Sequence, residues 1–372
     1  MPINLNENSN SKFTLPAKYY TDEKYFTEEI KKIFFDQWIC AGREEQIATP
    51  GQFFTREILG ENVILTRDES HQPRAFFNVC RHRGTRICDK ESGNFKGRIS
   101  CPYHAWTYGL NGELVGAPHM SDNEDFSMKD YPLHSIQCDT WDGNIWINLS
   151  SKAPSLKSSL GKIYPKFQAW EPEKLKLGKR IHYTVKANWK LIIQNYSECL
   201  HCPVIHPTLK KLSHYMSGEN EPLSPEFSGG KMSLNDGIAS MTVSGKTDRK
   251  IFEKLNEEQK RHVYYYWVNP NLLLSYHPDF LMTHTMWPKS PSLTEIICEF
   301  HFHPDELKKP GFSAEDAAIF WDEVNREDWY VSELSQVGIS SMSYTPGPYS
   351  SREGLLYGID QILTQQVGQV SL

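Results

Sequence analysis

The 372-residue sequence has no apolar run long enough to span a membrane, and its amino terminus has no basic stretch followed by an apolar one. Met1 to Ser11 is instead rich in Asn and Ser, so we expect a frayed tail on a cytoplasmic protein that has no membrane partner. The formal net charge is -6, which argues against a nucleic-acid partner because nucleic-acid-binding proteins normally carry a basic stripe.

The sequence also has no internal repeat, and its eight cysteines stand at uneven intervals. Without an export signal, this cysteine usage favours metal ligation or burial over a disulfide framework. One hydrophobic core rarely serves a chain of this length, so two domains are expected.

Changes in hydrophobic periodicity predict where the domains lie. Residues 20–40 have the apolar spacing of an amphipathic helix, and short alternating segments between residues 52 and 148 predict a small antiparallel domain. The Ser-, Lys- and Pro-rich residues 150–159 have the composition of a linker. We therefore place an N-terminal tail and helix, a small β-domain and a larger domain at residues 1–42, 43–150 and 151–372.

Within the larger domain, residues 210–250 have no clear period and predict long loops. Residues 262–302 predict a meander of strands that turns at residues 269–271 and 277–279. A long helix follows, with Ser313 as its cap and Gly338 as its stop.

Three polar residues, Asn195, Glu198 and His201, recur at every third position of an otherwise apolar helical segment. At about 100° per residue they form one stripe, which we expect to point inward. Pro203 stops or kinks the helix, so that His206 can turn back toward His201. Two imidazoles with a carboxylate suit non-haem Fe(II) and dioxygen. In isolation, however, His201 or Glu198 would more often be a hydrogen-bonded polar group of the core.

A second candidate metal site consists of C-R-H-R-G at residues 80–84 and C-P-Y-H-A-W at residues 101–106. Two Cys/His pairs on separate loops could bind tetrahedral zinc, which is the structural alternative. Zinc fingers pair Cys with Cys and His with His, whereas each loop here offers one of each. One iron can then take both thiolates and the other both imidazoles, which is the Rieske [2Fe-2S] arrangement.

With these two motifs, and with N-W-K and E-C-x-H-C-P-x-x-H-P between residues 188 and 207, the chain resembles the catalytic α subunit of Rieske non-haem iron oxygenases over nearly its whole length. The resemblance implies an α+β fold: a small all-β Rieske [2Fe-2S] domain, plus a catalytic domain whose curved antiparallel sheet is covered by helices. The N-terminal helix would pack on the catalytic domain. The implied cluster ligands are Cys80, His82, Cys101 and His104, and the implied ligands of the mononuclear Fe(II) are His201 and His206.

The resemblance also places Glu198 at the position of a bridging carboxylate, which is usually an aspartate in ring dioxygenases. In the family, this carboxylate links a cluster histidine of one subunit to an iron histidine of its neighbour, which implies a homotrimer. A glutamate there resembles the branch that acts on quaternary ammonium compounds such as carnitine and betaines. We predict Glu198 and Asn195 as the catalytic side chains.

The third iron ligand is predicted from helical phase in the late helix, where acidic residues crowd between residues 322 and 328. Asp328 falls inside the apolar arc of that helix, Asp322 falls nearly opposite, and Glu327 lies at the edge. Burying an ionised carboxylate costs several kcal/mol unless a cation compensates, so Asp328 needs a partner such as Fe(II). A buried salt bridge to Arg or Lys is the alternative.

Two further features of the sequence have structural interpretations. Cys199 and Cys202 flank His201 with the C-x2-C spacing that is otherwise typical of redox or zinc sites, but they are predicted to pack as small apolar groups beside the iron. The aromatic run at residues 264–267 could line a substrate pocket or cage an ammonium group, although sheet core accounts for most of its members.

We therefore predict a terminal oxygenase that activates O2 at the mononuclear Fe(II), with electrons from the Rieske cluster. It would hydroxylate or oxidatively demethylate a small organic substrate such as a quaternary or N-methylated amine. Dihydroxylation of an aromatic ring is the alternative reaction, and a zinc-stabilised ligand-binding module is the alternative that is not an enzyme. The sequence has neither G-x-G-x-x-G nor the cysteine run of plant ferredoxins, so a separate NAD(P)H-dependent reductase, of flavin or ferredoxin type, must supply the electrons.

Overall fold

A computed structural model describes residues 12–58 and 60–370 of the chain, and the predicted tail Met1 to Ser11 lies outside the described residues. The chain forms two compact units. One consists of residues 34–176, and the other combines residues up to 33 with residues from 177 onward.

These limits differ from the boundaries placed after residues 42 and 150 on the basis of composition. Two tryptophans account for the later boundary. The indole N–H of Trp38 donates to the Pro154 carbonyl at 2.8 Å, and that of Trp141 donates to the Tyr164 carbonyl at 2.9 Å. The polar segment after residue 150 is therefore held within the first unit, although its composition is that of a linker.

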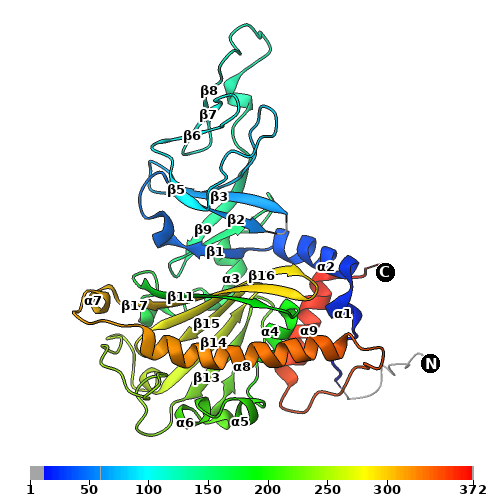
Figure 1. Cartoon of the computed structure of the whole chain (residues 1–372), viewed down its shortest axis with the longest axis vertical. Coiled ribbons are helices and arrows are strands. Elements are labelled where there is room, and N and C mark those ends of the chain that lie inside the picture. Colours follow the sequence, from blue (N-terminus) through cyan, green and yellow to red (C-terminus); the bar gives the residue numbers. More distant parts are fainter. Residues whose placement is uncertain (1–11, 59, 371–372) are drawn as a thin grey trace. The chain divides into compact units, whose positions relative to one another are not determined.

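The unit of residues 34–176 is built on antiparallel strands, as predicted (Figure 1). In its described part, seven strands pair in the order β1-β10-β9-β4-β3-β2-β5, and β6-β7-β8 form a separate sheet. The strands of the larger sheet are β1 (Ile39–Arg43), β2 (Gln52–Ile58), β3 (Glu61–Arg67), β4 (Pro73–Phe77), β5 (Ser92–Asn94), β9 (Ser135–Trp141) and β10 (Asn144–Asn148). Those of the smaller sheet are β6 (Arg98–Ser100), β7 (Thr107–Gly109) and β8 (Leu114–Gly116), and a short helix α3 (Leu156–Leu160) follows the strands.

A two-residue turn joins β9 to β10. Asp142 and Gly143 both have positive φ, 52° and 73°, as a hairpin turn of this length requires. A Cβ at Gly143 would lie 2.7 Å from the buried Arg43 guanidinium, so only glycine fits here.

The predicted helix over residues 20–40 is wrong in its extent. The chain instead forms α1 (Lys18–Thr21), α2 (Glu23–Glu29) and a π-helical turn (Ile30–Phe35). Asp22 caps α2 by accepting a hydrogen bond from the Tyr25 backbone N–H at 2.8 Å. The helical region ends early because the last residues of the predicted helix enter β1, which pairs with β10.

The second unit contains an antiparallel sheet whose described strands run in the order β11-β17-β16-β15-β14-β13-β12. The strands are β11 (Lys176–Val185), β12 (Glu219–Asn220), β13 (Phe227–Ser233), β14 (His262–Val268), β15 (Leu272–Tyr276), β16 (Leu281–Ser290) and β17 (Leu293–Phe302). The turns of the meander lie where they were predicted. Strand β13, however, falls in the region predicted as loops. A Cβ at Gly230 would lie 2.0 Å from the Glu219 carbonyl oxygen, so glycine is needed for this strand to pair closely with its neighbour. Glycine also has a low propensity for strands, which is why the sequence did not predict β13.

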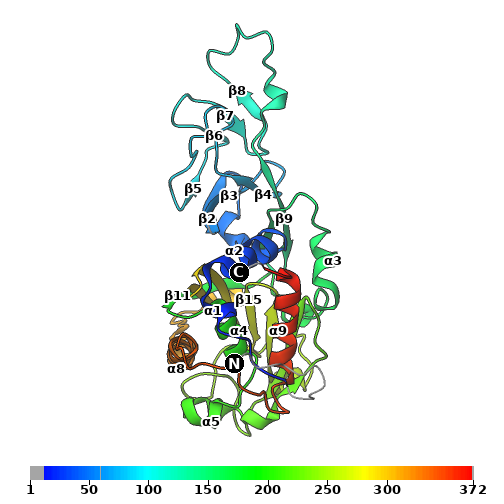
Figure 2. The same ribbon diagram turned by 90° about the vertical axis from the view of Figure 1, so that its right-hand side faces the viewer.

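Helices cover this sheet. Figures 1 and 2 show the long helix α8 (Glu315–Ile339) along one side of the strands and α9 (Gly354–Val367) on another. The shorter helices are α4 (Trp189–Tyr196), α5 (Cys202–Ile205), α6 (Leu209–Leu212) and α7 (Pro304–Leu307). Helix α4 contacts both α8 and β16. In the part of the chain that the structure describes, no helix combines the length and the apolar character needed to cross a membrane.

Candidate metal centres and substrate pocket

The two Cys/His motifs of the β-unit form two loops of the same construction. In the first loop the Cys80 backbone N–H donates to the Thr85 carbonyl, and in the second the Cys101 N–H donates to the Trp106 carbonyl, both at 2.8 Å. Each cysteine carbonyl in turn accepts from the fourth residue after it, which has a positive φ: 74° at Gly84 and 56° at Ala105. The two motifs are therefore matched turns, each presenting one sulfur and one imidazole.

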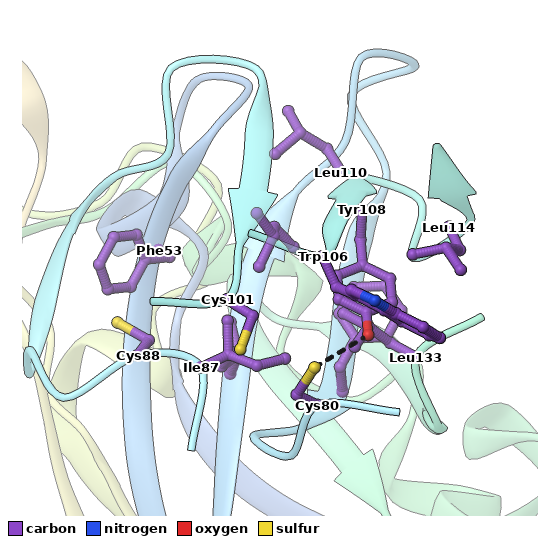
Figure 3. Close-up of a cluster of buried hydrophobic side chains, with 13 residues drawn as sticks. Phe53, Cys80, Ile87, Cys88, Cys101, Trp106, Tyr108, Leu110, Leu114 and Leu133 are labelled. Atoms are coloured by element: carbon purple, nitrogen blue, oxygen red, sulfur yellow. Dashed lines mark hydrogen bonds between the residues drawn. The ribbon is translucent and has the colours of Figure 1, made fainter. Parts of the chain in front are cut away.

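The cysteine and histidine side chains of these loops lie in different environments. The sulfurs of Cys80 and Cys101 are buried in an apolar cluster of the β-unit, while Cys88 lies apart from them beside Phe53 (Figure 3). The Cys80 sulfur contacts the Tyr108 hydroxyl at 3.4 Å.

The two imidazoles lie nearer the surface. The rings of His82 and His104 lie 4.8 Å apart, with His82 exposed and stacked on Trp106. Thiols on the inside and imidazoles on the outside fit a cluster in which each iron has one kind of ligand.

The thiol pair needs a cation to become a thiolate pair. Burial raises the pKa of Cys101, and the neighbouring Cys80 sulfur adds to the effect. Desolvation, His82 and Arg83 all lower the pKa of His104, which favours the neutral imidazole that metals bind. The donor set therefore fits a Rieske cluster.

The other candidate centre begins at α4. Asn188 caps this helix, since its side chain accepts from the Lys190 N–H at 3.0 Å. The expectation of one helix carrying Asn195, Glu198 and His201 is wrong. Helix α4 ends at Tyr196, Glu198 lies in the connection that follows, and His201 is the N-cap residue of α5. The connection still brings Glu198 and His201 together.

Three predicted ligand side chains converge in this unit. The Nε2 atoms of His201 and His206 lie 3.4 Å and 2.9 Å from the same oxygen, Oδ1 of Asp328 on α8. Asp322, one of the competing acidic residues, accepts a hydrogen bond from the Tyr183 hydroxyl at 2.8 Å instead. A fourth candidate donor is the Cys202 sulfur, which lies within 4.8 Å of the donor atoms of both histidines.

That sulfur is occupied. The structure joins Cys199 and Cys202 in a disulfide, with their Cα atoms 5.0 Å apart. The prediction that they pack as small apolar groups is therefore wrong, and the redox interpretation of their C-x2-C spacing fits the disulfide better. With Cys202 engaged, the donors left near one point are His201, His206 and Asp328.

Each of the two histidines also contacts a carboxylate through its other ring nitrogen, Nδ1. The Nδ1 atom of His201 lies 2.5 Å from Oε1 of Glu198, and Nδ1 of His206 lies 2.7 Å from Oε2 of Glu327. An Nδ1–H that donates to a carboxylate leaves the Nε2 lone pair free, and here both Nε2 atoms point toward Asp328. Glu327 lies only at the edge of the apolar arc of its helix, and 121 residues separate it from His206, so the sequence has no local signal for this contact.

Charges in this group are strongly coupled. Burial disfavours the imidazolium of His201, but Asp328 and Glu198 outweigh it and raise the pKa of His201 to about 9. Burial likewise opposes the ionised Asp328, but His201 and His206 hold its pKa below the usual value. The site thus balances its carboxylates with positive charge, which a divalent cation would supply in place of protons. The donor set of two imidazoles and a carboxylate fits mononuclear iron.

A cavity of about 200 Å³ opens beside these side chains, and Asn195 and Glu198 are in its wall together with the three predicted ligands. Aromatic rings make up much of the remaining wall. They come from the end of α4, the segment after it, β14 and α8, and they belong to Tyr196, Tyr215, Tyr265, Trp267, Trp321 and Trp329. The aromatic run on β14 is therefore divided by strand alternation, with Tyr265 and Trp267 lining this cavity.

Comparisons with known families match both units. The profile of the ring hydroxylating alpha subunit (catalytic domain) matches residues 172–369, and that of the Rieske [2Fe-2S] domain matches residues 37–134. The glycine betaine monooxygenase oxygenase subunit of Pseudomonas aeruginosa is 31% identical over an alignment that covers 91% of this chain and 85% of that protein. The carnitine monooxygenase oxygenase subunit of Escherichia coli is 36% identical over 56% of each chain.

Solved structures share the fold. A quaternary ammonium Rieske monooxygenase has a TM-score of 0.83 at 24% identity, with 97% of each chain covered. Naphthalene 1,2-dioxygenase from Rhodococcus sp. has a TM-score of 0.77 at 20% identity, with 95% of this chain and 94% of that chain covered. The predicted α+β fold with a Rieske domain and a helix-covered antiparallel sheet is confirmed.

Proposed function

Because the chain belongs to the ring-hydroxylating α-subunit family and combines its catalytic domain with a Rieske [2Fe-2S] domain, we propose that it is the oxygenase subunit of a monooxygenase acting on an N-methylated or quaternary ammonium compound. The family makes the chain an oxidoreductase that acts with O2, with a Rieske cluster and mononuclear iron as its cofactors. The substrate class is our proposal.

The predicted ligands form two groups, one for each cofactor. Cys80, His82, Cys101 and His104 would hold the cluster, and His201, His206 and Asp328 would hold the iron. When bound, the cluster supplies single electrons and the iron binds and activates O2.

Two further carboxylates of the chain hold the histidines in place and are not assigned as iron ligands. Glu198 and Glu327 fix the ring orientation and the protonation of the two histidines through Nδ1. Asn195 lies in the wall of the same cavity, where its amide can contact the substrate.

The single observation that carries the substrate proposal is the composition of the cavity wall. Tyr and Trp rings line the same cavity as the acidic residues Glu198 and Asp328. Aromatic faces attract a quaternary ammonium group through their quadrupole, and nearby carboxylates favour its positive charge. Two related proteins are named for substrates of this kind, glycine betaine and carnitine.

Electrons would come from a separate NAD(P)H-dependent reductase. The exposed His82 and half-buried His104 give such a partner access to the edge of the cluster site. In a trimer, Glu198 would bridge His201 and a cluster histidine of the neighbouring chain. One related structure is described in terms of inter-subunit electron transfer. The trimer, the type of reductase and the cytoplasmic location stay predictions.

Substrate-dependent O2 consumption with a surrogate reductase tests the proposal. Each trimethylammonium candidate is paired with its tert-butyl isostere, which has the same shape and no charge. We expect O2 consumption and an oxidised product with the ammonium member only. Turnover of aromatic hydrocarbons to cis-diols, with no response to any ammonium compound, would support ring dihydroxylation instead.

A further inference from the structure

The disulfide between Cys199 and Cys202 encloses His201, and both cysteines line the cavity. The Cys202 backbone N–H also donates to the Cys199 carbonyl at 3.2 Å, so the two cysteines close a short ring that contains the histidine. Glu198 contacts this ring twice, through the Leu200 N–H and through Nδ1 of His201. A group that can be oxidised and reduced is therefore part of the segment that carries a predicted iron ligand.

The two histidines belong to two alternative sets of metal donors. One set is completed by Asp328, whose Oδ1 atom lies 3.4 Å and 2.9 Å from the two Nε2 atoms. The other is completed by Cys202. In the described part of the chain, His201, Cys202 and His206 form a group whose donor atoms all lie within 4.8 Å of one another. The first set has only nitrogen and oxygen donors, whereas the second includes a sulfur.

The disulfide decides whether the second set can bind a metal. Metals bind the thiolate, and a sulfur in a disulfide is not a thiolate. The disulfide also holds the sulfur in place. Ligand atoms around one tetrahedral ion lie about 3.5 Å apart, so the Cys202 sulfur needs to move by at most about 1.3 Å to join the histidines. A free thiol moves by about 3 Å between staggered rotamers. Reduction therefore supplies both the thiolate and its freedom to reach the ion.

The two sulfurs differ in access. Cys199 is partly exposed, whereas Cys202 is 3% exposed. A dithiol reductant that enters from the cavity therefore attacks the Cys199 sulfur, and the S–S bond breaks with Cys202 as the leaving thiolate. The second thiol of the reductant then displaces Cys199 and closes the reductant's own disulfide. Two electrons and two protons pass from the reductant to the cysteines. When Cys202 binds a metal ion, its proton goes to the solvent.

We propose that Cys202 is a conditional metal ligand, controlled by its disulfide with Cys199. In the disulfide form, His201, His206 and Asp328 leave open positions on the ion, which suits iron and O2. In the reduced form, the Cys202 thiolate closes the site, and closed tetrahedral sites with sulfur and imidazole ligands are typical of zinc. The redox state of the disulfide thereby sets which metal the site retains. This inference rests on the two histidines as metal ligands in the proposed function, and it does not depend on the substrate.

The test uses the whole protein with its cluster in place, after the mononuclear iron has been removed by a chelator and replaced by zinc. X-ray absorption at the zinc edge reports only the atoms around zinc, so the sulfurs of the cluster do not enter. The disulfide form should have only nitrogen and oxygen ligands, at about 2.0–2.2 Å. A phosphine, which takes up the oxygen of water and leaves two thiols, reduces the disulfide before zinc is added. One sulfur ligand at about 2.3 Å should then appear.

Two serine variants lack the disulfide but differ in the thiol that remains. Cys199→Ser leaves Cys202 as a free thiol and should have the sulfur ligand without any reductant. Cys202→Ser is the matched control, since it retains only Cys199, and it should have no sulfur ligand before or after phosphine treatment. Cys199→Ser should also bind zinc at least about tenfold more tightly than Cys202→Ser, because a ligand should matter at least as much as the hydrogen-bond partner of a ligand.

Only nitrogen and oxygen ligands in both the phosphine-treated protein and Cys199→Ser would overturn the assignment of Cys202. A sulfur ligand in Cys202→Ser would also overturn it, because Cys199 would then be the donor. Alkylation and mass spectrometry establish the state of the cysteines, and two free thiols in the untreated protein would refute the control by a disulfide. If zinc binds none of these forms through histidine, the metal site of the proposed function itself fails. That result is distinct from zinc that is bound by histidine without sulfur.

Discussion

Lys190 and Glu29 form an ion pair in the interior of the catalytic unit, where each side chain is 1% exposed. The Lys190 Nζ atom lies 2.5 Å from Oε1 of Glu29, whose other oxygen accepts from the Trp189 indole at 3.2 Å. Burial raises the pKa of Glu29 and lowers that of Lys190, and each partner's charge counteracts the shift. Because Lys190 belongs to α4, the pair anchors the helix that precedes the candidate iron site.

Replacing Lys190 with Met leaves Glu29 as an uncompensated buried carboxylate. Losing one partner of such a pair costs about 3–5 kcal/mol, a large part of a typical folding free energy of about 5–15 kcal/mol. The lost cation–π contacts with Tyr20, Tyr25 and Trp189, at 5.5 to 5.7 Å, add to that cost. The double variant Lys190→Met/Glu29→Gln has no buried charge at this site and keeps an acceptor for the indole. It should recover at least about half of the loss.

Urea denaturation measures the change in the free energy of unfolding of the whole protein. Hydrogen exchange at the α4 amides measures the change in local stability of that helix. Lys186→Met, an exposed lysine just before α4, is the matched control and should change stability by less than about 0.5 kcal/mol. A loss below about 1 kcal/mol in Lys190→Met, or a double variant less stable than Lys190→Met alone, would refute this reasoning.

Three further predictions concern the metal site and pH. Asp328→Ala should lose the mononuclear iron and turnover but keep the cluster absorbance, while Asp322→Ala should keep both metals, as iron analysis and visible spectra will show. Glu198→Gln should retain metals yet turn over at least about tenfold more slowly. Mixed trimers of that chain with a Cys101→Ser chain should regain activity that neither parent has, and no regain in verified mixed trimers would contradict the inter-subunit bridge. Burial raises the pKa of Asp360 from 3.8 to about 6, so its contribution favours folding below pH 4 and is lost as pH rises through 6. Asp360→Asn should remove about 3 kcal/mol of that pH dependence, measured by denaturation at pH 3 and pH 7.

Features that depend on interactions between residues close together in the sequence could be predicted from the sequence. Cys80 and Cys101 each open a turn closed by hydrogen bonds within five residues, so their spacing alone predicts the loops. Asp328 could be chosen because helical phase is a short-range property, and the structure does bring it to the two histidines.

What could not be predicted depends on contacts between distant segments. Glu327 acquires its role only because α8 packs beside His206, and β13 forms only because its glycines approach neighbouring strands. The end of α4 and the Cys199–Cys202 disulfide also depend on the tertiary fold, since the same residues are compatible with a longer helix or with free thiols.

Metal and acid-labile sulfide analysis of the purified protein tests the central claim most directly. We expect about three irons and about two sulfides per chain, with the visible absorbance of a [2Fe-2S] cluster. Stoichiometric zinc without sulfide or visible colour would contradict it.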